Sequence, residues 1–210
     1  MKADYTLYLV TDDAENYPLG LLAGVEAALA GGVTLVQFRA VRGSRQRHYL
    51  TAVKLQDMLR ARRVPLVIND QVDLALAVDA AGVHVGQNDL PPAIVRRLIG
   101  RDRVLGLSIT HPDQIDAVDF SVVDYLGVGP VFATESIPDA APPLGLNALG
   151  DIVRQSPCPV VAIGGITVAN APTIFSTGIA GVAVISGLSS TPNPQEAARG
   201  FRAAAPQVSP

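Results

Sequence analysis

Short hydrophobic runs alternate along the chain with longer segments in which hydrophobic residues recur every three or four positions. Most of these longer segments have the spacing of an amphipathic helix, as in Leu21, Val25, Ala28 and Leu29. Continuous hydrophobic strands that alternate with helices predict a parallel sheet, and eight repeats of this unit favour a closed (β/α)8 TIM barrel in the α/β class. The eight predicted strands are residues 6–10, 33–36, 65–68, 82–85, 104–107, 125–128, 159–163 and 181–185.

An open, doubly wound sheet is the structural alternative. Against it, the first run leads into TDDAENYPLG, which has no glycine-rich turn of the dinucleotide-binding kind. The connection at residues 70–81 is short for a helical crossover, so we expect a shortened helix there. No linker or low-complexity segment divides the chain. Residues 1–210 are therefore predicted to form a single domain, with a frayed end after about residue 204.

The composition narrows the classes of function. Half of the residues are hydrophobic (49%) but only 5% are aromatic, which suits a core of aliphatic side chains. A formal net charge of −3 and the lack of a basic tract argue against nucleic acid and anionic membranes as partners. The single cysteine, Cys158, excludes an internal disulfide, and the N-terminal sequence resembles neither a signal peptide nor a membrane span. We expect a cytoplasmic protein, and a homo-oligomer is compatible with the sequence.

Polar residues follow the predicted strands, at the end of a barrel where active sites lie. Gln37 and Arg39 are two positions apart in a strand-like stretch, so they are predicted to point to the same side. An arginine there can bind phosphate oxygens with two parallel hydrogen bonds. The other polar residues at these ends are Asn69, Asp70, Asp89, Ser108, Thr134, Ser136 and Ser186.

Asp70 and Asp89 follow adjacent strands. Two carboxylates with substrate phosphate oxygens and water are a usual ligand set for Mg²⁺. Taken singly, Asp70 is equally explained as a cap of the next helix and Asp89 as part of a turn before a pair of prolines. As a pair at successive strand ends they favour a magnesium site.

A phosphate site is predicted after the last two strands, where Gly164 and Gly165 and then Ser186 break the pattern. Barrels commonly hold phosphate at this place with backbone N–H groups. Of the three histidines, His84 is predicted to be a core residue and His48 a solvated one. His111 lies on a loop at the barrel mouth, and its simplest interpretation is that it starts a helix.

The sequence resembles the thiamine phosphate synthase family over nearly its whole length. The resemblance is carried by YLVTD, GVTLVQFR, VPLVINDQVDLALAVDAAGVHVGQNDLP, VLGLSIT, DYLGVGPVFATES, PVVAIGGIT and GVAVISGL. It implies a Mg²⁺-dependent transferase of thiamine biosynthesis that joins hydroxymethylpyrimidine diphosphate to thiazole phosphate and releases pyrophosphate. The related thiazole tautomerases share the barrel and several of these motifs.

The resemblance also implies roles for single residues. Gln37, Arg39 and Asn69 match positions that hold the pyrimidine diphosphate, Asp70 and Asp89 match the magnesium ligands, and Ser108 matches a serine beside the pyrimidine. Thr134 and Ser136 fall where the family binds the thiazole substrate, and Gly165, Ile185 and Ser186 match its phosphate site. The family is thought to ionise the pyrimidine–diphosphate bond first, so no protein nucleophile is required. Arg39 and Ser108 are the residues predicted to assist the chemistry.

At two positions the chain departs from the family. Val41 and Ile137 stand where the family has lysines near the diphosphate, and Arg42 is a candidate replacement for the first. Three functions therefore remain open: a synthase, a thiazole tautomerase, and a non-catalytic protein that binds thiazole phosphate or thiamine phosphate. The tautomerase needs a histidine where this chain has Thr110, and the retained aspartates favour the synthase.

Overall fold

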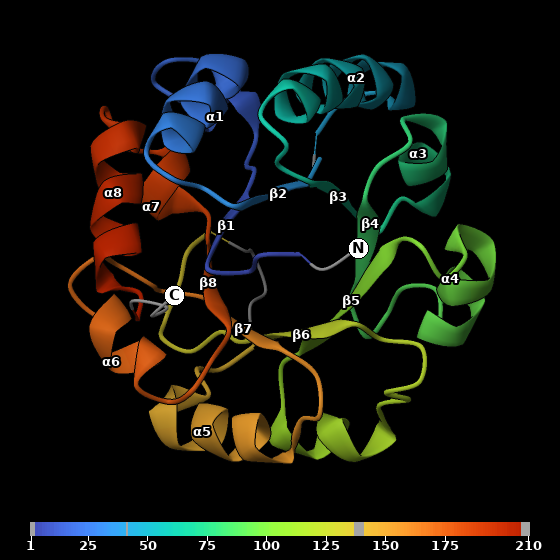
Figure 1. Cartoon of the computed structure of the whole chain (residues 1–210), viewed down its shortest axis with the longest axis vertical. Coiled ribbons are helices and arrows are strands. Elements are labelled where there is room, and N and C mark those ends of the chain that lie inside the picture. Colours follow the sequence, from blue (N-terminus) through green and yellow to red (C-terminus); the bar gives the residue numbers. More distant parts are fainter. Residues whose placement is uncertain (1–2, 41, 137–140, 207–210) are drawn as a thin grey trace.

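Eight parallel strands close into a barrel in a computed structural model, which describes residues 3–40, 42–136 and 141–206. Each strand pairs with its neighbours in sequence, and β1 pairs with β8, so the order is β1 to β8 around the barrel (Figure 1). The predicted α/β class and the TIM barrel are thus confirmed. The strands are β1 (Leu7–Val10), β2 (Leu35–Phe38), β3 (Leu66–Asn69), β4 (Gly82–Val85), β5 (Val104–Ile109), β6 (Tyr125–Val128), β7 (Val160–Ile163) and β8 (Gly181–Val184).

The helices form a ring outside the barrel (Figure 1). The predicted shortened helix between β3 and β4 is present as α3, with six residues. The connection from β5 to β6 contains a 3-10 helix instead of an α-helix. The helices are η1 (Ala14–Asn16), α1 (Leu21–Ala30), α2 (Arg45–Ala61), α3 (Val72–Ala77), α4 (Pro92–Ile99), η2 (Pro112–Ala117), α5 (Gly145–Gln155), α6 (Ala171–Phe175), α7 (Ser186–Ser189) and α8 (Pro194–Ala204).

The core has two layers because alternate residues of each strand point to opposite faces. In β2, Val36 and Phe38 point outward and pack in the large cluster between strands and helices. Leu35 points inward and belongs to a smaller cluster inside the barrel. The inner cluster is mostly aliphatic but also contains Tyr8 and Tyr125. Polar aromatic side chains therefore reach the barrel interior.

Two strand boundaries differ from the prediction in a way that matters for the site. β2 runs two residues further than predicted, so Gln37 lies inside the strand and only Arg39 follows it. β5 also extends two residues further, so Ser108 lies inside it. Both extensions are possible because these polar side chains find hydrogen-bond partners within the barrel.

The prediction that residues 1–210 form one domain with a frayed end stays a prediction, because the end of the chain lies outside the described residues. Within the described part, no helix is both long and hydrophobic enough to cross a membrane.

Candidate active site

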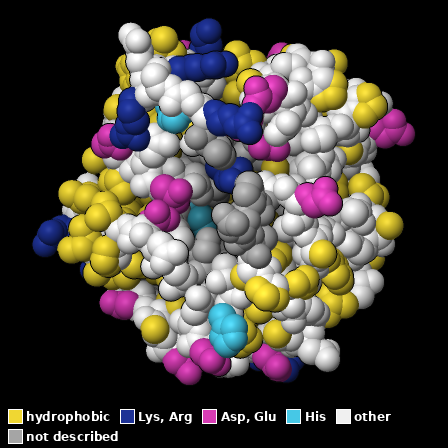
Figure 2. Space-filling view, turned by 180° about the vertical axis from the view of Figure 1, so that it is seen from behind, with side chains coloured by type: hydrophobic (Ala, Val, Ile, Leu, Met, Phe, Trp, Pro, Cys, Tyr) yellow, Lys and Arg dark blue, Asp and Glu magenta, His cyan; other side chains and the backbone are white. Residues whose placement is uncertain are grey.

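A cavity of about 370 Å³ opens among the carboxyl ends of the strands. Figure 2 shows this face of the molecule as hollowed, with Lys and Arg side chains gathered above the hollow in that view. The nine residues predicted to bind substrates all line this one cavity, although they come from six strands and the segments that follow them. They are Gln37, Arg39, Asn69, Ser108, Thr134, Ser136, Gly165, Ile185 and Ser186.

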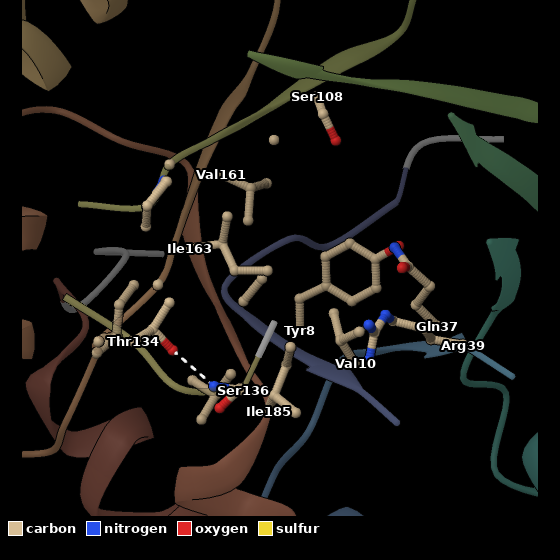
Figure 3. A pocket seen from close by; sticks show the side chains of 18 of the residues that line it. Tyr8, Val10, Gln37, Arg39, Ser108, Thr134, Ser136, Val161, Ile163 and Ile185 are labelled. Atoms are coloured by element: carbon tan, nitrogen blue, oxygen red, sulfur yellow. Dashed lines mark hydrogen bonds between the residues drawn. The ribbon is translucent and has the colours of Figure 1, made fainter. Parts of the chain in front are cut away.

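Gln37 and Arg39 project into the cavity from β2 and the residue after it, side by side as predicted (Figure 3). Gln37 is only 4% exposed, and its amide nitrogen donates to the Tyr8 hydroxyl at 2.9 Å. The guanidinium of Arg39 lies 4.0 Å from Asp12, and its side chain is 17% exposed. Among the described residues that line the cavity, Arg39 is the only lysine or arginine. It is thus the one described cation that can meet an anionic group inside.

Arg42 is not among the described residues that line the cavity. Its guanidinium contacts Glu15 at 2.5 Å and Asp13 at 3.5 Å, and its side chain is 76% exposed. Two acidic partners hold it against the η1 segment, away from the residues that line the cavity. The structure therefore gives no support to Arg42 as the replacement, and its role as a candidate stays a prediction. Val41 itself lies outside the described residues, as does Ile137.

Asp70 and Asp89 lie close enough for their side chains to share a hydrogen bond, but neither is among the described residues that line the cavity. The backbone N–H of Asp70 donates to the His84 carbonyl at 2.8 Å, which fixes Asp70 directly after β3. The Asn69 side-chain amide donates to the Asp70 carboxylate at 2.5 Å. Asp89 accepts from the Gly86 N–H at 2.7 Å and so closes a turn after β4. The turn assigned to Asp89 is confirmed, but Asp70 caps no helix, because Gln71 occupies the N-cap of α3.

The protonation of this pair suits a divalent cation. Partial loss of hydration, then the hydrogen bond with Asp89 and its negative charge, together raise the pKa of Asp70 to about 7, while Arg39 opposes the shift. Two carboxylates that share a proton near neutral pH can exchange it for a metal ion. If Mg²⁺ binds here, the pair would supply two of its six ligands, and substrate oxygens and water would supply the others. No cluster of three or more His, Cys, Asp or Glu side chains that could hold a metal ion occurs among the described residues.

The opposite side of the cavity combines small polar groups with a hydrophobic wall. The Ser136 N–H donates to the Thr134 hydroxyl at 3.2 Å, as the dashed line in Figure 3 shows. Ser136 Oγ donates to Ser186 Oγ at 3.0 Å. These bonds join the segment after β6 to the start of α7. Gly165 has a φ of +65°, and a Cβ there would lie 2.6 Å from the Ala133 carbonyl oxygen, so only glycine fits. The hydrophobic wall consists of Val161, Ile163 and Ile185.

With the fold and the cavity described, comparison with known proteins decides the family. A family model described as thiamine monophosphate synthase matches residues 7–188. The chain belongs to this family. The matched residues include all eight strands and every predicted site residue.

Individual members of the thiamine monophosphate synthase family are similar over nearly their whole length. Thiamine-phosphate synthase of Desulfitobacterium hafniense is 47% identical over 201 residues, which are 96% of this chain and 97% of the relative. Thiamine-phosphate synthase of Chloroflexus aurantiacus is 45% identical, with 95% and 92% covered. The solved structure of thiamine phosphate pyrophosphorylase from Pyrococcus furiosus superposes with a TM-score of 0.86 at 32% identity, with 96% of both chains covered.

For some polar residues of this family member the structure differs from the prediction, and two residues of the cavity were not predicted at all. His48, predicted to be solvated, is buried: its ring lies edge-on to Phe38, and Nε2 contacts the Arg42 carbonyl at 3.2 Å. His111 caps η2, as its simplest interpretation required. His84 is a satisfied core histidine as predicted, but it also lines the cavity and contacts Ser108 Oγ at 2.9 Å. Tyr8 and Tyr125 line the cavity too and were not identified.

We expect His84 to make the stability of this synthase-family barrel depend on pH. Burial lowers the pKa of His84 from 6.5 to about 4, so the unfolded chain binds a proton more readily between these values. The stability linked to neutral His84 is complete above pH 6.5 and is lost as the pH falls toward 4. By linkage the loss due to His84 at pH 5 is about 2 kcal/mol relative to pH 7.5. Protonation of Asp70 stabilises the folded chain over the same range, so the loss is measured as a difference between the wild-type chain and a variant without His84, by urea unfolding at both pH values.

His84→Gln is the control for this measurement, because glutamine does not titrate. The variant should lose about 2 kcal/mol less than the wild-type chain between pH 7.5 and pH 5. An equal loss in both proteins would show that His84 is not responsible.

Proposed function

We propose that this chain is a thiamine phosphate synthase that couples hydroxymethylpyrimidine diphosphate to thiazole phosphate. The observation that carries the proposal is the convergence of all nine predicted substrate-binding residues on one cavity. The cavity has a cationic side at Arg39 and a side of small hydroxyl and glycine groups at Thr134, Gly165 and Ser186. The cavity thus offers a different binding environment to each of the two phosphorylated substrates.

The pyrimidine diphosphate is assigned to the side of β2 to β5. Gln37 and Ser108 offer hydrogen bonds to a heteroaromatic ring. Asn69 and Arg39 also line the cavity, and both interact with Asp70, which in turn contacts Asp89. A guanidinium can hold two phosphate oxygens at once. The diphosphate is therefore expected to extend from the cavity toward the aspartate pair.

The thiazole phosphate is assigned to the opposite side. Thr134 and Ser136 face the thiazole ring, and Gly165, Ile185 and Ser186 surround its phosphate. The positive φ of Gly165 turns the backbone close to the cavity, and α7 begins at Ser186. Backbone N–H groups at such a site bind phosphate without a cationic side chain.

The proposed reaction breaks the bond between the pyrimidine methylene carbon and the diphosphate oxygen. Pyrophosphate leaves with the electron pair, and the thiazole nitrogen forms the new C–N bond with its own lone pair. No proton transfer to a protein nucleophile is required. Arg39 stabilises the negative charge that develops on the leaving oxygen, and the hydrophobic wall of Val161 and Ile163 limits the access of water to the carbocation.

Magnesium is part of this proposal. Asp70 and Asp89 would hold the ion, and their shared proton and adjacency support the assignment. When bound, Mg²⁺ supplies positive charge that neutralises the departing pyrophosphate.

The structure argues against one of the two alternative functions, and only the sequence favours the other. The tautomerase requires a histidine at Thr110, but here the Thr110 backbone N–H and hydroxyl both contact the Gln114 side chain, and His111 is outside the cavity lining. A non-catalytic binder is favoured only by Val41 and Ile137, where the family has lysines.

Incubation of the purified protein with both substrates and Mg²⁺ separates the proposal from the alternatives. Formation of thiamine phosphate supports the synthase. Binding of thiazole phosphate without any product would leave the non-catalytic binder as the function, and the absence of both would remove this assignment altogether.

Restoring the family lysines should raise the turnover. Val41→Lys and Ile137→Lys each add a cation at a position that the family places near the diphosphate. A charge-assisted hydrogen bond contributes about 1.5–3 kcal/mol, so each change is expected to raise kcat/KM by about ten- to a hundredfold. Gln46→Lys on the exposed surface of α2 adds the same charge elsewhere and serves as control. Equal rates in all four proteins would mean that the missing lysines do not limit this enzyme.

The proposal includes the cytoplasm as the place of action and small phosphorylated molecules as partners, with neither nucleic acid nor membrane involved. The net charge of −3 supports it, because it provides no attraction for polyanions. A homo-oligomer stays a prediction, which sedimentation analysis would test.

A further inference from the structure

Five polar side chains form one continuous chain of hydrogen bonds through the interior of the barrel. Gln37 Nε2 donates to Tyr8 Oη at 2.9 Å, and Tyr8 Oη lies 2.9 Å from Tyr125 Oη. Tyr125 Oη lies 2.8 Å from Nδ1 of His84, and Nε2 of His84 lies 2.9 Å from Ser108 Oγ. Both ends of the chain, Gln37 and Ser108, line the cavity. The chain therefore connects two groups that face a ligand.

The direction of this chain follows from the Gln37 amide nitrogen, which donates to Tyr8, and from the single proton of each hydroxyl. Tyr8 and Tyr125 are almost fully buried, and each hydroxyl has a single proton to donate. Tyr8 accepts from Gln37, so its own proton has only Tyr125 to go to among the described residues. If Tyr125 donated to Tyr8 instead, the Tyr8 proton would be left without an acceptor, which costs about 1–3 kcal/mol in a buried site.

The same reasoning extends to the histidine. Tyr125, once it accepts from Tyr8, donates its proton to Nδ1 of His84. An Nδ1 that accepts a hydrogen bond carries no proton, so the imidazole is neutral and has a single ring proton. With Nδ1 accepting, that proton is on Nε2 and is donated to Ser108 Oγ. The Ser108 hydroxyl proton then remains free to point into the cavity.

Two glycines make room for this arrangement. A Cβ at Gly106 would lie 2.2 Å from the Tyr125 ring and 2.4 Å from Nδ1 of His84. A Cβ at Gly127 would lie 2.9 Å from Cε1 of His84. Any larger residue in these two strands would displace the tyrosine or the histidine, so the chain of bonds is built into the inner face of β5 and β6.

We propose that Tyr8, Tyr125 and His84 form a directional hydrogen-bond relay that makes Gln37 an acceptor and Ser108 a donor toward the ligand. Gln37 uses its N–H inside the relay, and its Oε1 accepts no hydrogen bond from the described residues and is not among the buried unpaired atoms. The three relay residues are positioning residues, because they act through Gln37 and Ser108.

The relay selects a ring that offers an N–H group to Gln37 and an acceptor nitrogen to Ser108. An aminopyrimidine carries both kinds of group. An oxo analogue, with a carbonyl in place of the amino group and an N–H in place of the ring nitrogen, offers the reverse and would leave both ends mismatched. This specificity rests on the proposed synthase function, whereas the direction of the relay does not.

The position of the His84 proton tests the relay without any substrate. We expect ¹⁵N NMR of the full-length protein to show Nε2 protonated and Nδ1 unprotonated between pH 5.5 and 8.5, with the His84 signals identified by their absence in His84→Gln. A proton on Nδ1 would overturn the proposal, because it would reverse every bond and make Ser108 an acceptor.

Variants test whether the tyrosines set the tautomer of His84. Tyr125→Phe removes the group that donates to Nδ1 of His84 and leaves the histidine in place, so it should produce a mixture of both His84 tautomers. An unchanged spectrum in Tyr125→Phe would overturn the relay.

Two further variants should keep the wild-type tautomer. Tyr8→Phe leaves Tyr125 with Nδ1 of His84 as its one acceptor among the described residues, so Nε2 should stay protonated, and a proton on Nδ1 in this variant would also overturn the relay. Tyr5→Phe is the control, because its ring centroid lies 4.8 Å from that of Tyr125 but its hydroxyl makes no hydrogen bond with the described residues.

Substrate discrimination is the second readout. The wild-type chain should prefer hydroxymethylpyrimidine diphosphate over its oxo analogue, and Tyr8→Phe should reduce this preference in kcat/KM by roughly tenfold, the equivalent of one hydrogen bond. Equal preference in Tyr8→Phe and the wild type would contradict the relay. A protein with the expected tautomer but no turnover would contradict the synthase proposal and leave the relay standing.

Discussion

Arg39→Ala is expected to lower kcat/KM for coupling by at least about a hundredfold. Arg39 is the only lysine or arginine among the described residues that line the cavity. Two charge-assisted hydrogen bonds to the diphosphate contribute about 1.5–3 kcal/mol each, and a loss of about 3 kcal/mol already corresponds to a hundredfold change. Steady-state kinetics of pyrophosphate release measures the effect, and thermal unfolding checks that the barrel remains folded.

Two further variants make this prediction specific. Arg39→Lys keeps the charge but loses the planar fork, so it should retain an intermediate rate. Arg42→Ala removes an arginine only three positions away that contacts Asp13 and Glu15, and it should leave kcat/KM within about twofold, because exposed ion pairs contribute little. A loss in Arg42→Ala as large as that in Arg39→Ala would mean that the diphosphate lies along the rim near η1 instead of in the cavity.

Asp70→Asn should produce the second large effect. Asparagine has nearly the same shape and tolerates the positive φ of 59° at this position, so the backbone should not change. Loss of one of two carboxylate ligands is expected to raise the Mg²⁺ concentration needed for half-maximal rate, and to reduce the rate at saturating Mg²⁺ by at least about a hundredfold. Asp73→Asn on α3 removes an exposed carboxylate paired with Arg45 and is the control.

A stability measurement separates metal binding from general damage. The pKa of Asp70 is raised from 3.8 to about 7 in the folded chain, so its ionisation opposes folding as the pH rises through this window. In the presence of EDTA at pH 8, Asp70→Asn should therefore unfold at a higher temperature than the wild-type chain while being nearly inactive with Mg²⁺. A lower unfolding temperature would contradict the assignment, because it would mean that the Asp70 carboxylate stabilises the fold even when no metal ion balances its charge and that of Asp89.

The barrel was predictable because each strand is a continuous hydrophobic run, and because most connections have hydrophobic residues at every third or fourth position, as amphipathic helices do. The site was predictable for a related reason: parallel strands all end at one face, so Asn69, Ser108 and Ser186 meet there although they are far apart in sequence. Where the order of elements determines position, sequence reasoning succeeded. The roles of these residues in catalysis stay predictions until they are measured.

What the sequence did not reveal depends on the direction and partners of single side chains. Arg42 directly follows Val41, the position where the family has a lysine, yet its guanidinium pairs with Asp13 and Glu15 and lies outside the cavity. His48 lies in a largely polar helix, but the face that carries it packs on Phe38. Tyr8 and Tyr125 are isolated polar groups in hydrophobic strands, and only the closed barrel brings their hydroxyls together from residues 117 positions apart.

The time course of both products in one reaction tests the central claim most directly. With both substrates and Mg²⁺ present, the account predicts that thiamine phosphate and pyrophosphate appear at equal rates and that both stop when EDTA removes the metal. Release of pyrophosphate without thiamine phosphate, or coupling that continues in EDTA, would contradict a cavity in which Arg39 and a metal held by Asp70 and Asp89 assist the departure of the diphosphate.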